Sequence, residues 1–280
     1  MPGERQAIES GAVKSVVRGE DFEHVLFSRG VAPSAATLRV YLGGDGRAFV
    51  SRRRVARDPT PPRPLALNLM LNDPGPAVYV GRPCYHSARG GLEARGGLEA
   101  RGEPDSPGAE SVDATALCHP RLWTTERYSP AVVDSLARVV TNLADQHPVA
   151  RLTLIGYSGG GVLALLVARQ LERVSLVVTV AAPLDLAAWT RHHGYTPLFG
   201  SGDPAAVSSW PATLRQFHLH GSQDDNVPPK LVERFRAAAG GAVEFRVIDG
   251  FDHVCCWLQA WPELLGSLPE GNGQPAVFSR

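Results

Sequence analysis

The chain has 280 residues, of which 44% are hydrophobic and 20% are charged, values typical of a soluble globular protein with a sizeable core. Basic and acidic residues each total 28, and this zero formal net charge favours neither a nucleic-acid partner nor an anionic membrane surface. The sequence contains no apolar run of the roughly 20 residues that a membrane span needs, and its start has no apolar signal segment. We expect a cytoplasmic location, or a periplasmic or secreted one if the N-terminus is processed or the start is mis-assigned.

The first predicted elements are two short strands at residues 12–17 and 23–28, joined by a polar turn. Because no helix separates them, we expect them to form an antiparallel edge of the sheet. Compact apolar segments at 38–42 and 77–81 predict buried strands. A glycine-rich turn, a basic proline-rich loop at Ser51–Pro64 and a short helical stretch lie between those two strands.

Residues 86–112 differ in composition from the rest of the chain. They contain a tandem repeat of RGGLEA and few apolar residues. Such a segment cannot bury enough surface to order itself, so we predict a low-complexity surface insertion.

Strands and helices alternate after the insertion. Ser129-Pro130 predicts a helix start with a hydroxyl N-cap. Strands are expected at 152–156, 175–182, 216–220 and 243–248, with helices after 161, at 228–239 and at the end. Residues 183–212 look irregular, and we expect them to form a short cap or lid-like segment. The pattern predicts one α/β domain over residues 1–280, a mostly parallel central sheet with helices on both faces and an antiparallel N-terminal edge.

The segment Gly156-Tyr157-Ser158-Gly159-Gly160 has the G-x-S-x-G form and lies between a predicted strand and a predicted helix, the setting that this motif requires. The flanking glycines permit a strained turn that exposes the serine hydroxyl. The N-terminus of the next helix favours the negative charge of an oxyanion. We therefore predict that Ser158 is a nucleophile, although an incidental serine in a glycine-rich turn has the same local pattern.

A serine hydroxyl needs a base to remove its proton, and the chain has nine histidines. His253 follows the end of a predicted parallel strand, so it should share a sheet edge with Ser158. The same argument applies to Asp224, which follows the strand at 216–220 and would orient the histidine. Asp225 is the alternative acid, and an Asp-Asp pair also suits a solvated turn.

The segment from about residue 38 to 266 resembles the α/β-hydrolase superfamily. The resemblance rests on the turn at Gly43–Gly46, on G-Y-S-G-G, and on H-G-x-x-D-x-x-V-P followed by a G-x-x-H turn. It implies that the catalytic acid is Asp224 and that the oxyanion hole uses the backbone N–H groups of Gly159 and of a residue near Asp45. Members often have His-Gly in the early turn, where this chain has Gly43-Gly44.

The four cysteines suggest two different outcomes. A disulfide between Cys84 and Cys118 would tie the base of the insertion in an oxidising compartment, whereas both could also be buried as small apolar residues. For Cys255 and Cys256 we expect burial without mutual bonding, because neighbours on a helix point in different directions.

These features predict a serine hydrolase that cleaves a small or medium carboxylic ester or thioester through an acyl-enzyme. No metal-ligand spacing, phosphate loop or dinucleotide fingerprint is visible, so we expect no cofactor and no metal. The alternatives are a non-catalytic binding protein with this fold, or a hydrolase of amide, peptide, lipid or peroxide substrates. The small-substrate prediction rests on the shortness of the 183–212 segment.

Overall fold

The computed structural model describes residues 2–31, 37–51, 54–86, 118–147, 151–239 and 242–268. The predicted insertion at 86–112 therefore lies outside the described residues, except for His86. The α-helices are α1 Pro2–Glu9, α2 Leu65–Leu71, α3 Pro130–Gln146, α4 Gly159–Ala168, α5 Leu186–His193, α6 Glu233–Ala238 and α7 Trp257–Gly266. The strands are β1 Val13–Arg18, β2 Glu23–Arg29, β3 Thr37–Leu42, β4 Phe49–Ser51, β5 Arg54–Val55, β6 Ala77–Val80, β7 Arg151–Tyr157, β8 Val174–Val180, β9 Arg215–Gly221 and β10 Val243–Ile248. Short 3-10 helices are η1 Pro120–Trp123, η2 Pro204–Ala206 and η3 Pro229–Val232.

Eight strands form one sheet in the order β1-β2-β6-β3-β7-β8-β9-β10. The pairs β1–β2 and β2–β6 are antiparallel, and every pair from β6 to β10 is parallel. The predicted fold class, including its antiparallel N-terminal edge, is confirmed. The carboxyl ends of β3, β7, β9 and β10 consequently lie along one edge of the sheet.

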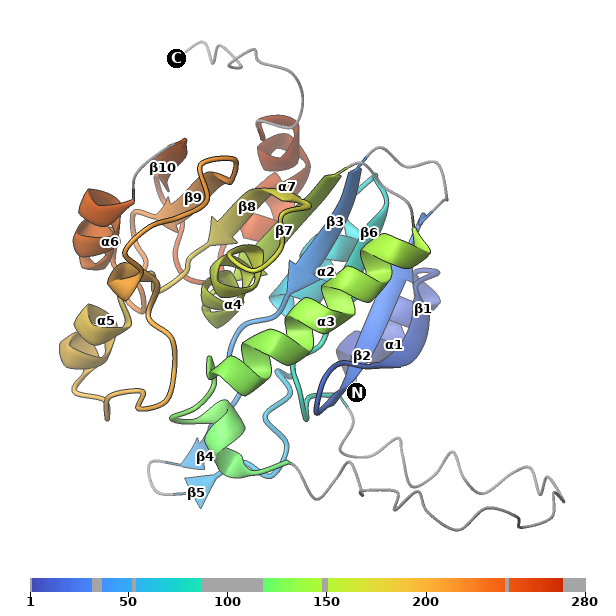
Figure 1. Ribbon diagram of the computed structural model, residues 1–280, viewed down its shortest axis with the longest axis horizontal. Coiled ribbons are helices and arrows are strands. Elements are labelled where there is room, and N and C mark those ends of the chain that lie inside the picture. Colours follow the sequence, from blue (N-terminus) through green and yellow to red (C-terminus); the bar gives the residue numbers. More distant parts are fainter. Residues whose placement is uncertain are drawn as a thin grey trace, which may run out of the picture.

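Helices cover both faces of this sheet. Figure 1 shows α3 and α4 on one face and α2 and α7 on the other. The first layer packs Leu136, Val140 and Leu163 on the inward residues of β3 and β7, and the second buries Trp257 and Trp261 against the opposite face. Burial along α3 follows the helical spacing expected from the sequence. None of the helices in the described ranges is long and apolar enough to cross a membrane.

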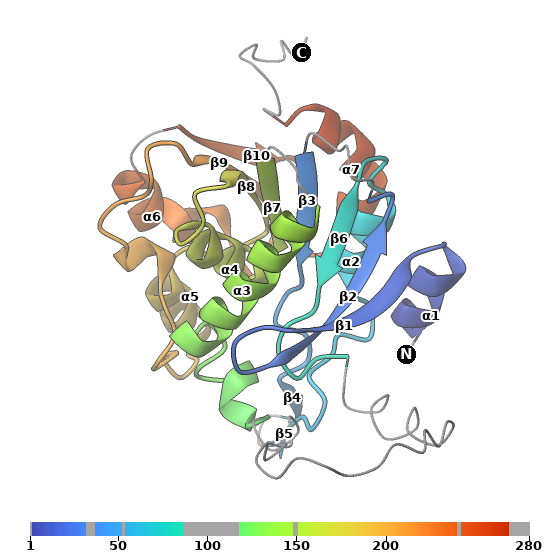
Figure 2. The same cartoon turned by 45° about the vertical axis from the view of Figure 1, so that its right-hand side comes forward.

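The structure differs locally from the sequence predictions in four places. The sequence did not indicate α1 or the small hairpin β4–β5, which occupies part of the proline-rich loop. Figure 2 shows this hairpin beside η1, where the indole of Trp123 donates to the carbonyl oxygen of Ala56. The segment 183–212 is not wholly irregular, because it contains α5 and η2. Finally, α3 does begin at Pro130, but the Ser129 hydroxyl makes no capping bond.

Cys84 and Cys118 form a disulfide with a Cα–Cα distance of 5.7 Å. The expectation for the other two cysteines was wrong. Cys255 and Cys256 are bonded to each other, and Cys255 is exposed. The reason is that α7 begins only at Trp257, so both cysteines lie in the preceding loop and helical geometry does not keep their side chains apart.

Candidate active site

Ser158 occupies the sharp turn between β7 and α4. Its backbone angles of φ 52° and ψ −126° are strained for a residue with a side chain. Close packing explains the two outer glycines of the motif. A Cβ on Gly156 would lie 2.2 Å from the Gly160 carbonyl oxygen, and one on Gly160 would lie 2.1 Å from the Leu42 oxygen. The sequence therefore holds the serine at the carboxyl edge of the sheet by removing side chains around it.

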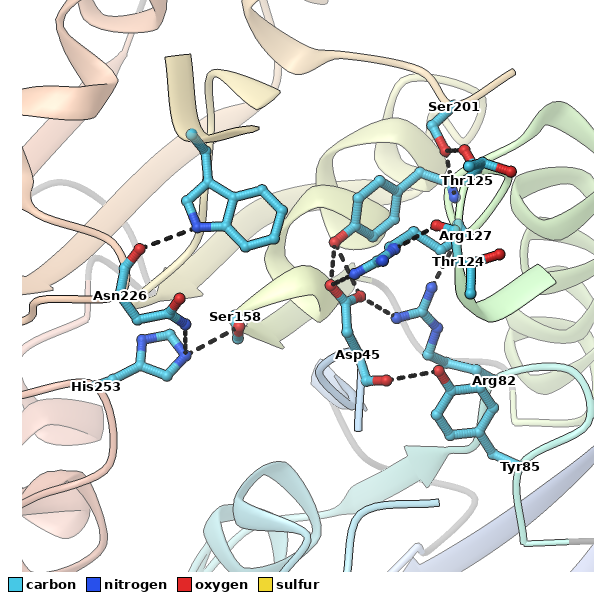
Figure 3. A network of polar contacts seen from close by, with 12 residues as sticks. Asp45, Arg82, Tyr85, Thr124, Thr125, Arg127, Ser158, Ser201, Asn226 and His253 are labelled. Carbon is cyan, nitrogen blue, oxygen red and sulfur yellow. Dashed lines mark hydrogen bonds and ion pairs between the residues drawn. The ribbon is translucent and has the colours of Figure 1, made fainter. Parts of the chain in front are cut away.

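The structure brings Ser158, His253 and Asp224 together in one hydrogen-bonded chain. The Nε2 atom of His253 lies 3.1 Å from Ser158 Oγ, and its Nδ1 atom lies 2.8 Å from Asp224 Oδ2. Figure 3 shows the histidine ring turned toward the serine. A carboxylate at Nδ1 favours the tautomer that leaves the Nε2 lone pair free for the serine proton.

Of the two neighbouring aspartates, Asp224 contacts the histidine and Asp225 is exposed. The Asp224 side chain is fully buried, and its Oδ1 accepts hydrogen bonds from the backbone N–H groups of Asn226 and Val227. Burial would raise the pKa of Asp224, but the hydrogen bond with His253 and these N–H groups outweigh it and lower the pKa. The carboxylate is therefore held in its ionised form beside the imidazole.

Two aromatic residues hold the loop that carries His253. The Tyr157 hydroxyl donates to the His253 carbonyl oxygen at 3.0 Å, and the two rings lie 5.3 Å apart between centroids. The Trp257 indole donates to the carbonyl oxygen of Asp252 at 2.9 Å. Tyr157 is the variable position of G-x-S-x-G, so the motif contains this residue but says nothing of its role.

Asn226 lies beside the same nitrogen of His253 that faces the serine. Its Nδ2 atom is 3.0 Å from His253 Nε2. The main-chain carbonyl oxygen of Asn226 lies 2.9 Å from the indole nitrogen of Trp189 and 2.7 Å from Nε2 of His193, both on α5. Asn226 was not among the predicted site residues, although its place two residues after Asp224 could have indicated it.

The glycine-rich turn after β3 runs beside Ser158, because the register pairs Leu42 with Gly156. A Cβ on Gly44 would lie 3.3 Å from the Ser158 Cβ. The first N–H groups of α4 belong to Gly159 and Gly160, and such groups have no partner within their own helix. The backbone of Gly159 and that of Asp45 thus flank the serine from two segments.

The side chain of Asp45 is the centre of a compact ionic cluster. The carboxylate accepts hydrogen bonds from Arg82, from Arg127 at 2.7 Å and from the Tyr128 hydroxyl at 2.7 Å. The main-chain carbonyl oxygen of Asp45 accepts a hydrogen bond from the Tyr85 hydroxyl at 2.8 Å. Burial would raise the pKa of Asp45, but the charges of Arg127 and Arg82 outweigh it and hold the pKa well below its usual range. Figure 3 shows this cluster on the side of Ser158 away from His253. The sequence carried no signal for it, because the arginines lie outside the motifs and on separate segments.

A cavity of about 1290 Å³ opens at Ser158 and His253. Its wall includes the aromatic residues Phe49, Tyr79, Trp189 and Tyr195. Trp210, which also belongs to the 183–212 segment, does not line the cavity and packs on Phe235, with ring centroids 5.9 Å apart. Among the described residues, no group of three or more His, Cys, Asp or Glu could hold a metal ion.

Comparison with known proteins identifies the fold. No protein-family model and no curated protein sequence matches the chain. Among solved structures, it is similar to the Pyrococcus furiosus esterase Pf2001, with a TM-score of 0.55, 16% identity, and coverage of 93% of this chain and 90% of that one. It is also similar to XC6422 from Xanthomonas campestris, described as an α/β serine hydrolase without lid, with a TM-score of 0.51, 14% identity, and coverage of 93% and 96%.

A third similar structure is a puromycin hydrolase mutant, with a TM-score of 0.58 and 16% identity, which covers 91% of this chain but only 38% of that one. These likenesses agree with the mostly parallel sheet and its helices on both faces. The chain has the α/β-hydrolase fold.

Proposed function

We propose that this protein is a serine hydrolase that cleaves small or medium carboxylic esters or thioesters through an acyl-enzyme. The observation that carries the proposal is the hydrogen-bonded chain from Ser158 through His253 to the buried Asp224. A serine on a strained turn, a base within hydrogen-bond reach and an acid that orients the base are the parts that acyl transfer requires. The solved structures named above, two of them an esterase and a serine hydrolase, support the same reaction class.

In the first half of the reaction, Ser158 Oγ attacks the carbonyl carbon while His253 Nε2 takes its proton. Asp224 stabilises the imidazolium that forms and keeps its Nδ1–H oriented. The negative charge on the carbonyl oxygen is stabilised by the backbone N–H groups of Gly159 and Asp45. Collapse of the tetrahedral intermediate expels the alcohol or thiol, which receives the proton from His253.

In the second half, water attacks the acyl-serine and gives its proton to the same nitrogen of His253. The acid product then leaves, and the Ser158 hydroxyl is regenerated. The amide of Asn226 competes with the serine hydroxyl for Nε2 in the resting site. We propose that the Asn226 amide turns away from His253 when substrate occupies the cavity, and that it then binds the leaving group.

The test is hydrolysis of 4-nitrophenyl butyrate, a butyryl thioester and a butyryl 4-nitroanilide by the wild-type protein. We expect turnover of the ester and thioester, with kcat falling by about 10³-fold or more in Ser158→Ala. Ser208→Ala is the matched control, since Ser208 is exposed and does not line the cavity. Absence of turnover on all three acyl compounds would favour the non-catalytic alternative, and a preference for the anilide would favour an amidase.

A further inference from the structure

The charges around the cavity are unbalanced. Its charged wall residues, apart from histidines, are Asp45, Arg47, Arg63 and Arg127 in the part of the chain that the structure describes. One carboxylate therefore faces three guanidinium groups. Since the whole chain has no net charge, this local excess is not a consequence of overall composition.

The negative charge of Asp45 is already neutralised by neighbouring arginines. Arg82, only 1% exposed, binds Asp45 together with Arg127, so the two guanidinium groups share one negative charge. Asp45, Arg82 and Arg127 together therefore carry one net positive charge at the inner wall. Within the described ranges, the Nε atom of Arg82 has no hydrogen-bond partner.

Arg47 and Arg63 add two further charges at the outer wall. Both are exposed and both belong to the chain between β3 and α2, which continues from the glycine-rich turn. Arg47 makes one weak contact, at 3.5 Å, with the Val50 carbonyl oxygen. The basic proline-rich loop at Ser51–Pro64 thus supplies Arg63 to the same cavity as the serine, and Arg47 lies just before that loop.

Three other carboxylates make contacts outside the cavity wall. Asp224 is buried behind His253, Glu126 lies 3.5 Å from Arg121, and Asp58 accepts the N–H of Thr60. None of the three lines the cavity. Aromatic residues such as Phe49 and Tyr195 supply apolar area beside the cations.

We propose that the substrate is an anionic ester or thioester, with a carboxylate or phosphate group that lies against the Arg47, Arg63 and Arg127 side of the cavity. Guanidinium groups bind such anions through charge-assisted hydrogen bonds, and a partly enclosed wall screens them less than open water does. This inference rests on the proposed function and adds the class of substrate to it.

The experiment compares matched anionic and neutral esters. On the acyl side the pair is 4-nitrophenyl hydrogen succinate and 4-nitrophenyl methyl succinate. On the leaving-group side the pair is 3-carboxyphenyl butyrate and its methyl ester. The readout is the ratio of kcat/KM for the anionic to the neutral member, compared between wild type and variants so that intrinsic reactivity cancels.

The double variant Arg47→Gln/Arg63→Gln should lower this ratio by about tenfold for at least one pair, about threefold for each charge removed. Arg169→Gln is the matched control, an exposed arginine at the far end of the helix that follows Ser158, and should leave the ratio unchanged. Added salt should lower the wild-type ratio. An equal ratio in the double variant and wild type, for both pairs, would overturn the inference.

A binding measurement separates this inference from the proposed function. Calorimetry on Ser158→Ala should show tighter binding of 4-phenylbutyrate than of 4-phenylbutyramide, with the difference lost in the added Arg47→Gln/Arg63→Gln background. Equal binding of the two ligands would refute the anionic site even if neutral esters are hydrolysed. A clear preference without any ester hydrolysis would support the anion site and refute the hydrolase.

Discussion

Gly159 packs directly against the carboxylate of Asp45. A Cβ on Gly159 would lie 2.1 Å from Asp45 Oδ1, closer than any side chain could approach. The residue after the proposed nucleophile and the turn after β3 are therefore fixed to each other. Because both are proposed to supply oxyanion N–H groups, the Asp45 cluster should set the geometry between them.

Asp45→Asn should therefore lower both stability and turnover. The change leaves buried Arg82 without its negative partner, and breaking a buried ion pair in this way costs about 3–5 kcal/mol. Denaturant unfolding and kcat for 4-nitrophenyl butyrate measure the two effects. Asp134→Asn is the control, because Asp134 lies on α3 and makes an exposed contact with Gln170. A variant with unchanged stability would show that the cluster contributes little to the fold.

Asp224→Asn should reduce turnover by about 10³- to 10⁴-fold, because the amide no longer stabilises the imidazolium or its productive tautomer. Asp225→Asn should remain near wild type, since Asp225 is exposed and makes no contact with His253. The two variants differ by one position in the same turn, so each controls for the other. The reverse pattern of kcat values would assign the acid to Asp225.

Stability should fall as the pH is lowered from about 6.5 to about 4. Burial lowers the pKa of His24 to about 4, against a weaker opposing effect of its hydrogen bond to the Gly81 carbonyl. Between these two pH values the unfolded chain binds a proton at this position and the folded chain does not, so acid favours unfolding.

The denaturation midpoint, measured across this pH window, should therefore vary less in His24→Gln than in wild type. His192→Gln, at an exposed histidine of α5, should keep the wild-type dependence. An identical slope in His24→Gln would mean that His24 does not contribute to the acid sensitivity.

In a panel of 4-nitrophenyl esters, kcat/KM should peak at short or medium acyl chains. The segment over the cavity is short, and its one α-helix, α5, is tied to the loop of Asp224 through Trp189 and Asn226. It therefore offers no long apolar helix that could open onto a lipid surface. A maximum at palmitate, with activation at an oil–water interface, would contradict this prediction.

The sheet could be predicted from the sequence, and three candidate site residues could be placed at one edge of it, because these signals are local. Ser158, Asp224 and His253 each follow a strand end, and parallel strands bring those ends to one edge. Arg127 could not be predicted, because its contact with Asp45 joins distant segments of the chain. Asn226 was missed for another reason, since its place in the Asp224 turn was visible but its contact with His253 was not. The error at Cys255 and Cys256 had a different origin, since the start of α7 was placed two residues too early.

Fluorophosphonate labelling followed by peptide mapping tests the central claim most directly. The reagent phosphonylates a serine only where a base and oxyanion donors activate it. We predict one labelled peptide, modified at Ser158, and complete loss of labelling in Ser158→Ala with an unchanged circular dichroism spectrum. Full labelling of Ser158→Ala, or no labelling of folded wild-type protein, would contradict the assignment of Ser158 as the nucleophile.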